Sequence, residues 1–363
     1  METHEKTSYL DLAKRIVDKR GSNPLYLIMY VTTRCNLKCQ HCFYWESLNT
    51  GKYELKLDEH QKISESMGKL AFLSLTGGEP FLRNELPQIA ELYCKNTGVR
   101  KIAIPTNGSF TNKIIEGTKY ILDHCPNASL DMNISLDGIG DDHDQIRGVK
   151  GSFDKAIKTY EGLKELKKTY NKLGISVITT FTAQNQYKIM QIYEWIRDNL
   201  TEAMPIVNLV RGSPLNPDVS KVDIKEYERI TNAVTEDYKN NIRYNKNAPM
   251  AKISTAKNAI RYKLIAETYK EKKFISQCYA AQLSGVMYEN GDVFCCELLN
   301  KKIGNVKDYN YDFTKLWNSE KADEIIKFIK DTKCFCTHEC FWTTNILFNP
   351  KYYPKILVES IKI

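Results

Sequence analysis

Residues 33–45 read TRCNLKCQHCFYW and place Cys35, Cys39 and Cys42 in a Cys-x3-Cys-x2-Cys pattern. Three thiolates on one short loop can hold a cuboidal iron–sulfur cluster through three of its irons, and the fourth iron is then open to another ligand. Zinc is the alternative, but structural zinc prefers Cys-x2-Cys pairs and four protein ligands, and only His41 inside the pattern offers a nearby fourth. The spacing therefore favours an iron–sulfur cluster over zinc or a chance grouping.

Six short apolar runs, one of them directly before this loop, predict strands that are buried on both faces. They lie at residues 25–32, 70–75, 101–104, 129–136, 175–181 and 205–210. Helical periodicity fills intervals between them, for example at residues 85–95, 113–124, 152–170 and 188–199. Alternating strands and helices predict an α/β fold with parallel strands and right-handed crossovers. Six units are too few for an eight-fold barrel, so we expect an open or partial barrel, or a doubly wound sheet.

The alternation ends after residue 212. A linker at residues 213–217 leads to helical patterns at residues 223–240 and 249–274. Asn290-Gly291 between two apolar runs predicts a hairpin over residues 285–294, because both turn residues of such a hairpin need a positive φ. A helix at residues 313–330 and a group of cysteines complete the pattern. We therefore divide the chain into an N-terminal helix, the strand–helix domain, a helical linker and a small cysteine-rich α+β domain, at residues 1–24, 25–212, 213–274 and 275–363.

The composition predicts a folded protein with reduced thiols. Hydrophobic residues make up 42% of the 363, and no run approaches the roughly 18 apolar residues of a membrane span. Residues 1–20 are charged and lack the apolar block of a secretory signal, so we expect a cytoplasmic protein. Its eleven cysteines are an odd number, which argues for metal ligation by some of them rather than for a disulfide framework. The net charge of +8 is mild and forms no basic stripe, so we expect neither a nucleic-acid nor a membrane partner.

A second motif, Gly77-Gly78-Glu79-Pro80, follows the second apolar run in the stretch LSLTGGEPFL. With this motif at the end of the next strand, the chain resembles the radical S-adenosylmethionine (SAM) enzymes over residues 25–212. The resemblance implies a partial (β/α)6 TIM-like barrel and a [4Fe–4S] cluster whose open iron chelates SAM. One electron from the cluster would cleave SAM, and the resulting 5′-deoxyadenosyl radical would abstract a hydrogen atom from a substrate, while the protein supplies orientation and a dry site.

The resemblance also implies a set of SAM-binding residues at the ends of successive strands. Glu79 and the Gly-Gly backbone would receive the methionine amino group, Arg147 in HDQIRG would bind the SAM carboxylate, and Asn185 and Val210-Arg211 would contact ribose and adenine. Glycines let the backbone approach a ligand, and a carboxylate pairs with an ammonium group. The full set is His41, Gly77, Gly78, Glu79, Pro80, Asn107, Ser135, Asp137, Arg147, Asn185 and Val210.

Six further cysteines lie between residues 278 and 340, in an arrangement that resembles the SPASM and twitch extensions of this family, which hold auxiliary [4Fe–4S] clusters. Two auxiliary clusters would need eight protein ligands, but this segment has only six cysteines, so we expect one auxiliary cluster. The predicted ligands are Cys278, Cys296, Cys336 and Cys340, with Cys334 as a possible replacement. Cys295 adjoins Cys296 on a predicted strand, so the two side chains should point to opposite faces and Cys295 should be no ligand. A zinc site that includes His338 is the alternative.

Glu297 immediately follows Cys296. In the sulfatase-maturating members of the family an acidic residue follows the corresponding cysteine and acts as a base. By resemblance, Glu297 is a candidate catalytic base that deprotonates a substrate hydroxyl while the auxiliary cluster accepts an electron. A solvated strand glutamate is the alternative.

Three functions fit these motifs. The first is a radical SAM oxidoreductase that dehydrogenates or remodels a small polar metabolite, such as a sugar or aminocyclitol. The second is a maturase that forms a crosslink or formylglycine in a peptide or protein. The third is a non-enzymatic iron–sulfur or zinc scaffold protein, which both intact motifs disfavour. Residues 1–24 are too short for the leader-binding domain of many peptide maturases, so we expect a small-molecule substrate. By resemblance, a flavodoxin or ferredoxin donates the electrons.

Overall fold

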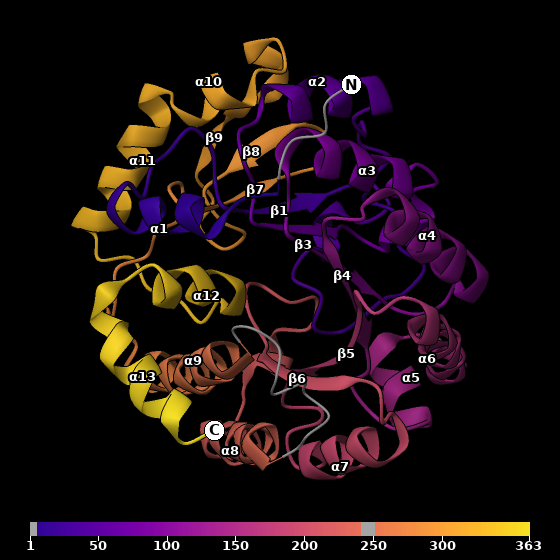
Figure 1. Ribbon diagram of the computed structural model, residues 1–363. Coiled ribbons are helices and arrows are strands. Elements are labelled where there is room, and N and C mark those ends of the chain that lie inside the picture. The colour runs from indigo at the N-terminus through magenta and orange to yellow at the C-terminus, as the bar shows by residue number, and fades with distance from the viewer. Residues whose placement is uncertain (1–5, 241–250) are drawn as a thin grey trace.

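Parallel strands at the centre and helices outside them form the main body of the protein. The computed structural model describes residues 6–240 and 251–363, and Figure 1 shows the strands surrounded by helices. All six predicted strands are present, with ends shifted by one or two residues in most cases. They are β1 Tyr26–Tyr30, β2 Phe72–Thr76, β3 Lys101–Thr106, β4 Ser129–Ser135, β5 Leu173–Phe181 and β6 Met204–Leu209. Each pairs with the next in parallel, which confirms the predicted strand–helix repeat.

Helices between these strands cover the outer face of the sheet. They are α2 Leu57–Ser66, α3 Leu86–Thr97, α4 Thr111–His124, α5 Asp141–Arg147, α6 Ser152–Thr169 and α7 Ile189–Asn199, preceded by α1 Tyr9–Val17. In α3 the buried residues Leu86, Ile89, Ala90 and Tyr93 recur at helical spacing and face the core. Burying this stripe against the sheet stabilises a helix that would be marginal alone.

The remaining helices and strands follow the barrel. They are α8 Ile224–Asn240, α9 Ala251–Glu271, β7 Ser284–Met287, β8 Asp292–Phe294, β9 Lys302–Asn305, α10 Phe313–Trp317, α11 Glu320–Asp331, α12 Glu339–Leu347 and α13 Tyr353–Ile361. Helix α9 contacts α8, α12 and α13, and α8 contacts β6, so these helices lie together beside the last barrel strand (Figure 1). The first residues of the predicted helix at 249–274 lie outside the described residues.

The hairpin after the barrel does not form a sheet of its own. The sheet runs in the order β6-β5-β4-β3-β2-β1-β7-β8-β9, and β7 pairs in parallel with β1, so that Tyr26 lies opposite Ser284. The main core likewise includes residues from both parts, such as Leu27 of β1 and Trp317 of α10. The cysteine-rich segment therefore extends the barrel sheet and shares its core.

Three local predictions for this segment are wrong. The predicted helix at 313–330 is two helices, because the chain breaks at Asn318 and the Ser319 side chain caps α11 by accepting from the Ala322 amide. The predicted hairpin is present, because β7 and β8 pair antiparallel, but the expected turn geometry is wrong: the turn spans four residues, 288–291, and only Gly291 among them has a positive φ, of 91°. Strand β8 ends at Phe294, so Cys295 and Cys296 follow the strand and its alternation does not separate their side chains.

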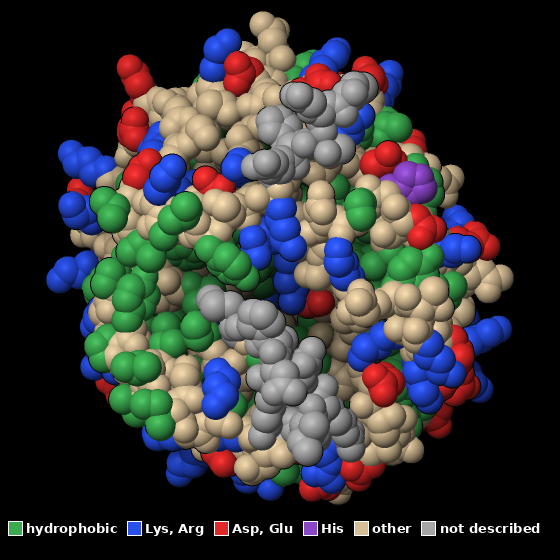
Figure 2. Space-filling view, in the orientation of Figure 1, with side chains coloured by type: hydrophobic (Ala, Val, Ile, Leu, Met, Phe, Trp, Pro, Cys, Tyr) green, Lys and Arg blue, Asp and Glu red, His purple; other side chains and the backbone are tan. Residues whose placement is uncertain are grey.

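One face of the molecule carries an apolar area. In Figure 2 hydrophobic side chains gather on the left, over the region that α12 and α13 occupy in Figure 1. On α13, the side chains of Leu357, Val358 and Ile361 are exposed. Within the described residues, no helix is both long enough and apolar enough to cross a bilayer.

Candidate active site

A cavity opens where the barrel strands end and the cysteine loop begins. The thiols of Cys35, Cys39 and Cys42 line it, together with residues from the carboxyl ends of β1 to β6. Ligand sites of parallel α/β folds lie at this end of the sheet, because the loops there can vary without disturbing the strands. The position of the cavity agrees with the sequence prediction for the cysteine loop.

Hydrogen bonds and close backbone packing fix the cysteine loop. Asn49 accepts from the Cys35 amide and donates to the Cys35 carbonyl, both at 3.0 Å. Asn107 Nδ2 donates to Asn36 Oδ1 at 2.9 Å. A Cβ at Gly78 would overlap the Arg34 carbonyl oxygen, so only glycine lets the Gly-Gly-Glu-Pro turn lie against the loop.

The donor set of this cavity fits an iron–sulfur cluster. Burial raises the pKa of the Cys35 thiol to about 12 and that of Cys42 to about 11, so each thiol would hold its proton at neutral pH unless a metal bound the thiolate. Thiolates bind the irons of a cuboidal cluster singly. Among residues 6–240 and 251–363, no three His, Cys, Asp or Glu side chains converge as ligands of a single metal ion.

Glu79 lies at the wall of this cavity and is almost fully buried. Its carboxylate accepts hydrogen bonds from the Asn107 amide at 2.7 Å, the Thr106 hydroxyl at 2.8 Å and the Phe81 amide at 3.2 Å. Burial raises the pKa of Glu79 to about 7, although these hydrogen bonds oppose the shift. The Thr-Asn-Gly segment after β3 thus orients the glutamate that the sequence assigns to SAM.

The structure brings most of the predicted SAM-binding residues to the cavity. His41, Gly77, Gly78, Glu79, Asn107, Ser135 and Arg147 line it. Pro80 lies behind the wall as the first residue of the short 3-10 helix η2, Pro80–Leu82. Asp137 is fully buried behind Arg147, with 2.7 Å between Asp137 Oδ2 and Arg147 Nη2.

Two further predicted residues, like Pro80 and Asp137, do not line the cavity. The Asn185 amide donates to the backbone carbonyls of Asp137 and Thr180 and accepts from the Thr182 amide, so it joins loops within the fold. Val210 is buried, and its neighbours Leu209 and Arg211 line the cavity instead. Val210 therefore lies outside the cavity lining.

A charged network that the sequence did not predict forms another part of the wall. Glu297 Oε1 accepts from the Tyr30 hydroxyl at 2.6 Å, while Glu297 Oε2 lies 3.3 Å from Arg211 Nη2 and contacts His338 Nε2. Arg211 Nη1 lies 3.2 Å from Glu339 Oε2. Burial would raise the pKa of Glu297, but the charges of Arg211 and His338 outweigh it and lower this pKa to about 2.

These contacts favour an anchoring role for Glu297 over the acceptance of a substrate proton. A carboxylate with three donors and a depressed pKa is a weak base at neutral pH. The sequence singles out Arg211 as a candidate SAM contact beside Val210, but not as a partner of Glu297. Tyr30 could have been found from the sequence, because it lies near the end of the first apolar run. No local signal indicates the contact with His338, which comes from a distant segment.

Thiols from three separate segments meet beside this network. Cys278 precedes β7, Cys296 follows β8, and Cys334 and Cys336 lie between α11 and α12. Burial and the neighbouring Cys296 and Cys334 thiols raise the pKa of Cys278 to about 12, and burial and Cys278 raise the pKa of Cys336. The Leu299 amide donates to Cys296 Sγ at 3.1 Å.

Cys340 and Cys295 lie in different surroundings. The pKa of Cys340 is raised by burial, and its strongest electrostatic neighbours are Arg211 and Glu297 rather than the other thiols. Cys295 is fully buried and hydrogen-bonded to the Cys296 thiol, which raises its pKa. This contact contradicts the prediction that the two side chains point to opposite faces.

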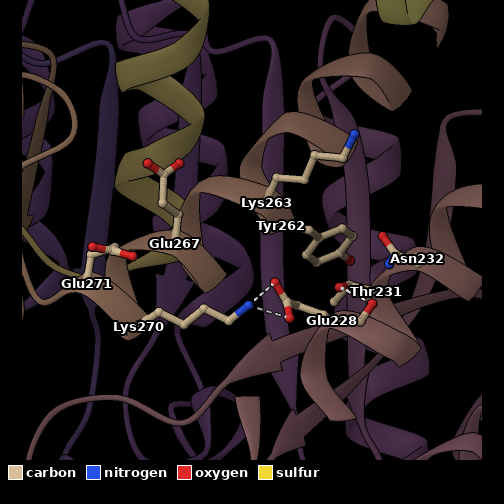
Figure 3. A pocket seen from close by; sticks show the side chains of 8 residues that line it. All are labelled: Glu228, Thr231, Asn232, Tyr262, Lys263, Glu267, Lys270 and Glu271. Carbon is tan, nitrogen blue, oxygen red and sulfur yellow. Dashed lines mark hydrogen bonds and ion pairs between the residues drawn. The ribbon is translucent and has the colours of Figure 1, made fainter. Parts of the chain in front are cut away.

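Another hollow lies between α8 and α9, away from the motif residues (Figure 3). Two of its charged groups pair with each other, since Lys270 Nζ lies 2.6 Å from Glu228 Oε1. Neither cysteine group contributes to its wall. The cavity at the strand ends is therefore the candidate active site.

The fold and the site together define an α/β barrel protein that gathers three thiols at the carboxyl ends of its parallel strands. Residues 29–196 match the Radical SAM superfamily, so the chain carries a radical SAM domain. Members of this superfamily are enzymes that use a [4Fe–4S] cluster and SAM, and its SPASM-type members carry auxiliary clusters.

Similar proteins differ in how much of the chain they share. Fe-coproporphyrin III synthase of Methanosarcina barkeri (strain Fusaro / DSM 804) is 29% identical over 206 residues, 53% of this chain and 47% of that protein. The antilisterial bacteriocin subtilosin biosynthesis protein AlbA of Bacillus subtilis (strain 168) is 24% identical over 328 residues, 85% of this chain and 65% of that protein. The chain thus spans about half to two thirds of these relatives.

A solved structure shows that the whole fold is shared. Native anSMEcpe with bound AdoMet superposes with a TM-score of 0.57 at 17% identity, over 93% of this chain and 99% of that one. The superposition includes the segment after the barrel as well as the radical SAM domain. The predicted α/β architecture, a partial barrel with an appended smaller region, is confirmed.

Proposed function

We propose that the protein binds a [4Fe–4S] cluster on Cys35, Cys39 and Cys42, with SAM at the open iron, and abstracts a hydrogen atom from its substrate. The observation that supports this most is that the three thiols and Glu79 line one cavity within the radical SAM domain. When bound, the cluster supplies the electron that cleaves SAM reductively. The chain's own residues bind and orient SAM and keep water from the site.

The wall of the cavity offers a matching group for each end of the amino acid part of SAM. The Glu79 carboxylate is held by Thr106 and Asn107 and would pair with the methionine ammonium group. Ser135 at the end of β4 lines the cavity beside Arg147 and would donate to the SAM carboxylate, since Nη1 and Nη2 of Arg147 contact Cys39 and Asp137. His41 and Asn107 would complete the polar surroundings.

For the auxiliary cluster, the proposed ligands are Cys278, Cys296, Cys334 and Cys336. Their thiols influence one another electrostatically, which supports a shared site. Cys334 thereby takes the place that the sequence assigns to Cys340, whose neighbours are Arg211 and Glu297. A second cluster here would lie beside the Glu297 network and could accept an electron from a substrate in that part of the cavity.

Two substrate classes stay open as proposals. The polar wall formed by Tyr30, Arg211 and Glu297 suits the hydroxyl groups of a small metabolite such as a sugar or aminocyclitol, which the enzyme would dehydrogenate or remodel. A peptide maturase is the second candidate, because AlbA matches most of the chain, and similar solved folds include SuiB bound to precursor peptide SuiA. An electron donor such as a flavodoxin or ferredoxin, and a cytoplasmic location, remain predictions.

Anaerobic reconstitution tests the proposed chemistry. We expect about eight irons per chain and release of 5′-deoxyadenosine when SAM and a reductant are added. A protein that takes up zinc and cleaves no SAM would contradict the proposal. The substrate classes are then separated by adding pools of peptides or of polyhydroxylated metabolites, and by asking which one increases 5′-deoxyadenosine formation and transfers deuterium to it.

A further inference from the structure

The C-terminal end of α5 is built against the cysteine loop. The Lys38 amide donates to the Arg147 carbonyl and the Gln40 amide donates to the Ile146 carbonyl, both at 3.1 Å. Gly148 then ends the helix with a φ of 73°, and a Cβ there would lie 2.9 Å from the Lys38 carbonyl oxygen. The backbone on both sides of Cys39 is therefore fixed by α5.

The side chain at the same helix end reaches the cluster thiol. Arg147 Nη1 donates to Cys39 Sγ at 3.6 Å, and Arg147 Nη2 lies 2.7 Å from Asp137 Oδ2. Asp137 is fully buried and Arg147 is only 7% exposed, so solvent screens this arrangement little. The two ends of the guanidinium fork thus join a buried carboxylate to a predicted iron ligand.

Further contacts fix Asp137 in turn. Its Oδ1 accepts from the Thr180 amide at 2.7 Å, and its own amide donates to His143 Nδ1 at 3.1 Å. His41 Nε2 lies 3.5 Å from Asp137 Oδ2 on the other side. The carboxylate can therefore hold the Arg147 guanidinium in one orientation without moving itself.

We propose that Arg147 tunes the reduction potential of the cluster on Cys35, Cys39 and Cys42 through its N–H···S hydrogen bond, and that Asp137 is the positioning residue for Arg147. This inference rests on the proposed function. Hydrogen bonds to the sulfurs and the net charge around a cluster set its potential. A donor at Cys39 stabilises the more negative, reduced cluster, which makes the electron transfer to the cluster easier.

The structure distinguishes this role from the one implied by the family resemblance. There, Arg147 would bind the SAM carboxylate. Here Nη1 faces Cys39 and Nη2 faces Asp137, so groups of the chain itself orient the guanidinium, while Nε has no hydrogen-bond partner among the described residues. An effect of Arg147 on the cluster should therefore be measurable before SAM is added.

The test is a redox titration of the iron-loaded protein in the absence of SAM, monitored by electron paramagnetic resonance. The signal of the cluster on Cys35, Cys39 and Cys42 is identified beforehand as the component that changes when SAM is added. Arg147→Met removes the donor at similar side-chain length, and we expect a more negative midpoint potential without SAM. Arg147→Lys keeps one charge but cannot span both partners, so we expect a smaller shift in the same direction. Arg34→Met is the matched control, because Arg34 lies on the same loop but pairs with Glu54 and is half-exposed, so solvent screens its charge and we expect a much smaller shift.

Each outcome decides the proposal. If Arg147→Met loses the cluster, Arg147→Lys supplies the measurement. Unchanged potentials in variants with full iron content would overturn the inference. If these variants also bind SAM more weakly, Arg147 would be assigned to the SAM carboxylate instead. If the unaltered protein binds no cluster, the proposed function itself fails, whereas normal SAM cleavage with unchanged potentials removes only the role of Arg147.

Discussion

Cys39 is fixed at both its backbone and its side chain, since α5 accepts hydrogen bonds from the loop backbone around it and Arg147 donates to its sulfur. We predict that Cys39→Ala abolishes SAM cleavage, because two remaining thiolates cannot hold the cluster with one iron open. Iron analysis and 5′-deoxyadenosine assays measure both effects. Cys94→Ala, in α3 and outside both cysteine groups, is the control and should retain both; turnover in the Cys39 variant would refute the cluster assignment.

Two nearby cysteines allow a direct test of the auxiliary ligands. Cys334 lies with the other thiols, whereas Cys340 lies beside Arg211 and Glu297. We predict that Cys334→Ser loses about four irons per chain and that Cys340→Ser keeps them, because only the first removes a thiolate from the cluster. Iron content and the visible absorption of the clusters provide the measurement. The reverse result would return Cys340 to the ligand set.

Glu297 offers a test of stability as well as of catalysis. It is buried and receives Tyr30, Arg211 and His338, so its removal leaves buried donors unpaired. We predict that Glu297→Ala lowers the free energy of unfolding by about 3–5 kcal/mol, the usual cost of breaking a buried ion pair. Denaturant unfolding under anaerobic conditions measures the change. Glu324→Ala, on the exposed face of α11, is the control, and equal effects in the two variants would contradict the anchoring role.

At the scale of single elements, two glycines separate backbone strain from packing. Gly148 and Gly151 both have left-handed backbones, with φ of 73° and 77°, but only Gly148 faces a close neighbour, the Lys38 carbonyl. We predict that Gly151→Ala costs about 1–2 kcal/mol from strain alone. Gly148→Ala should cost more and also lower the iron content, because the added methyl group displaces the cysteine loop.

Thermal unfolding and iron analysis of the two alanine variants compare these effects. Equal losses of stability with equal iron content would show that α5 does not position the loop.

The elements differ in how well the sequence predicts them, because some depend on residues close together in the sequence and others on contacts between distant segments. Each of the strands β1 to β6 is visible as a local apolar run, although buried and partly exposed positions alternate along β2, β3, β4 and β6. The motifs that follow β1 to β4 contribute residues to the cavity. The break between α10 and α11 depends on the N-cap at Ser319. The apolar residues on both sides of it keep a helical spacing, so the periodicity alone predicts one continuous helix. Asn185 and Val210 follow β5 and β6 as predicted but do not line the cavity. The Asn185 side chain instead bonds the Asp137 carbonyl, a contact that its local sequence does not reveal.

For the whole molecule, the decisive contact is the pairing of β7 with β1, which no local pattern encodes. Leu27 lies opposite Gly285, from segments far apart in the chain. Composition and turn signals predicted the later segment as a separate small domain, whereas in the structure it extends the same sheet and core. This continuity places Glu297 at the wall of the barrel cavity, with the second group of thiols beside the Glu297 network.

Gly285 tests this continuity. A Cβ at Gly285 would lie 2.6 Å from the Trp317 ring, so the glycine lets α10 close on the sheet beside β1. We predict that Gly285→Val costs about 1–3 kcal/mol through overpacking. Because the segments share one core, tryptophan fluorescence and circular dichroism of the iron-loaded variant should shift together in a single transition. Gly304→Ala, at a more open position of β9, is the control and should shift less. A change in tryptophan fluorescence that preceded the change in circular dichroism would show that the later segment is an independent unit. Its thiols would then not be held rigidly beside Glu297.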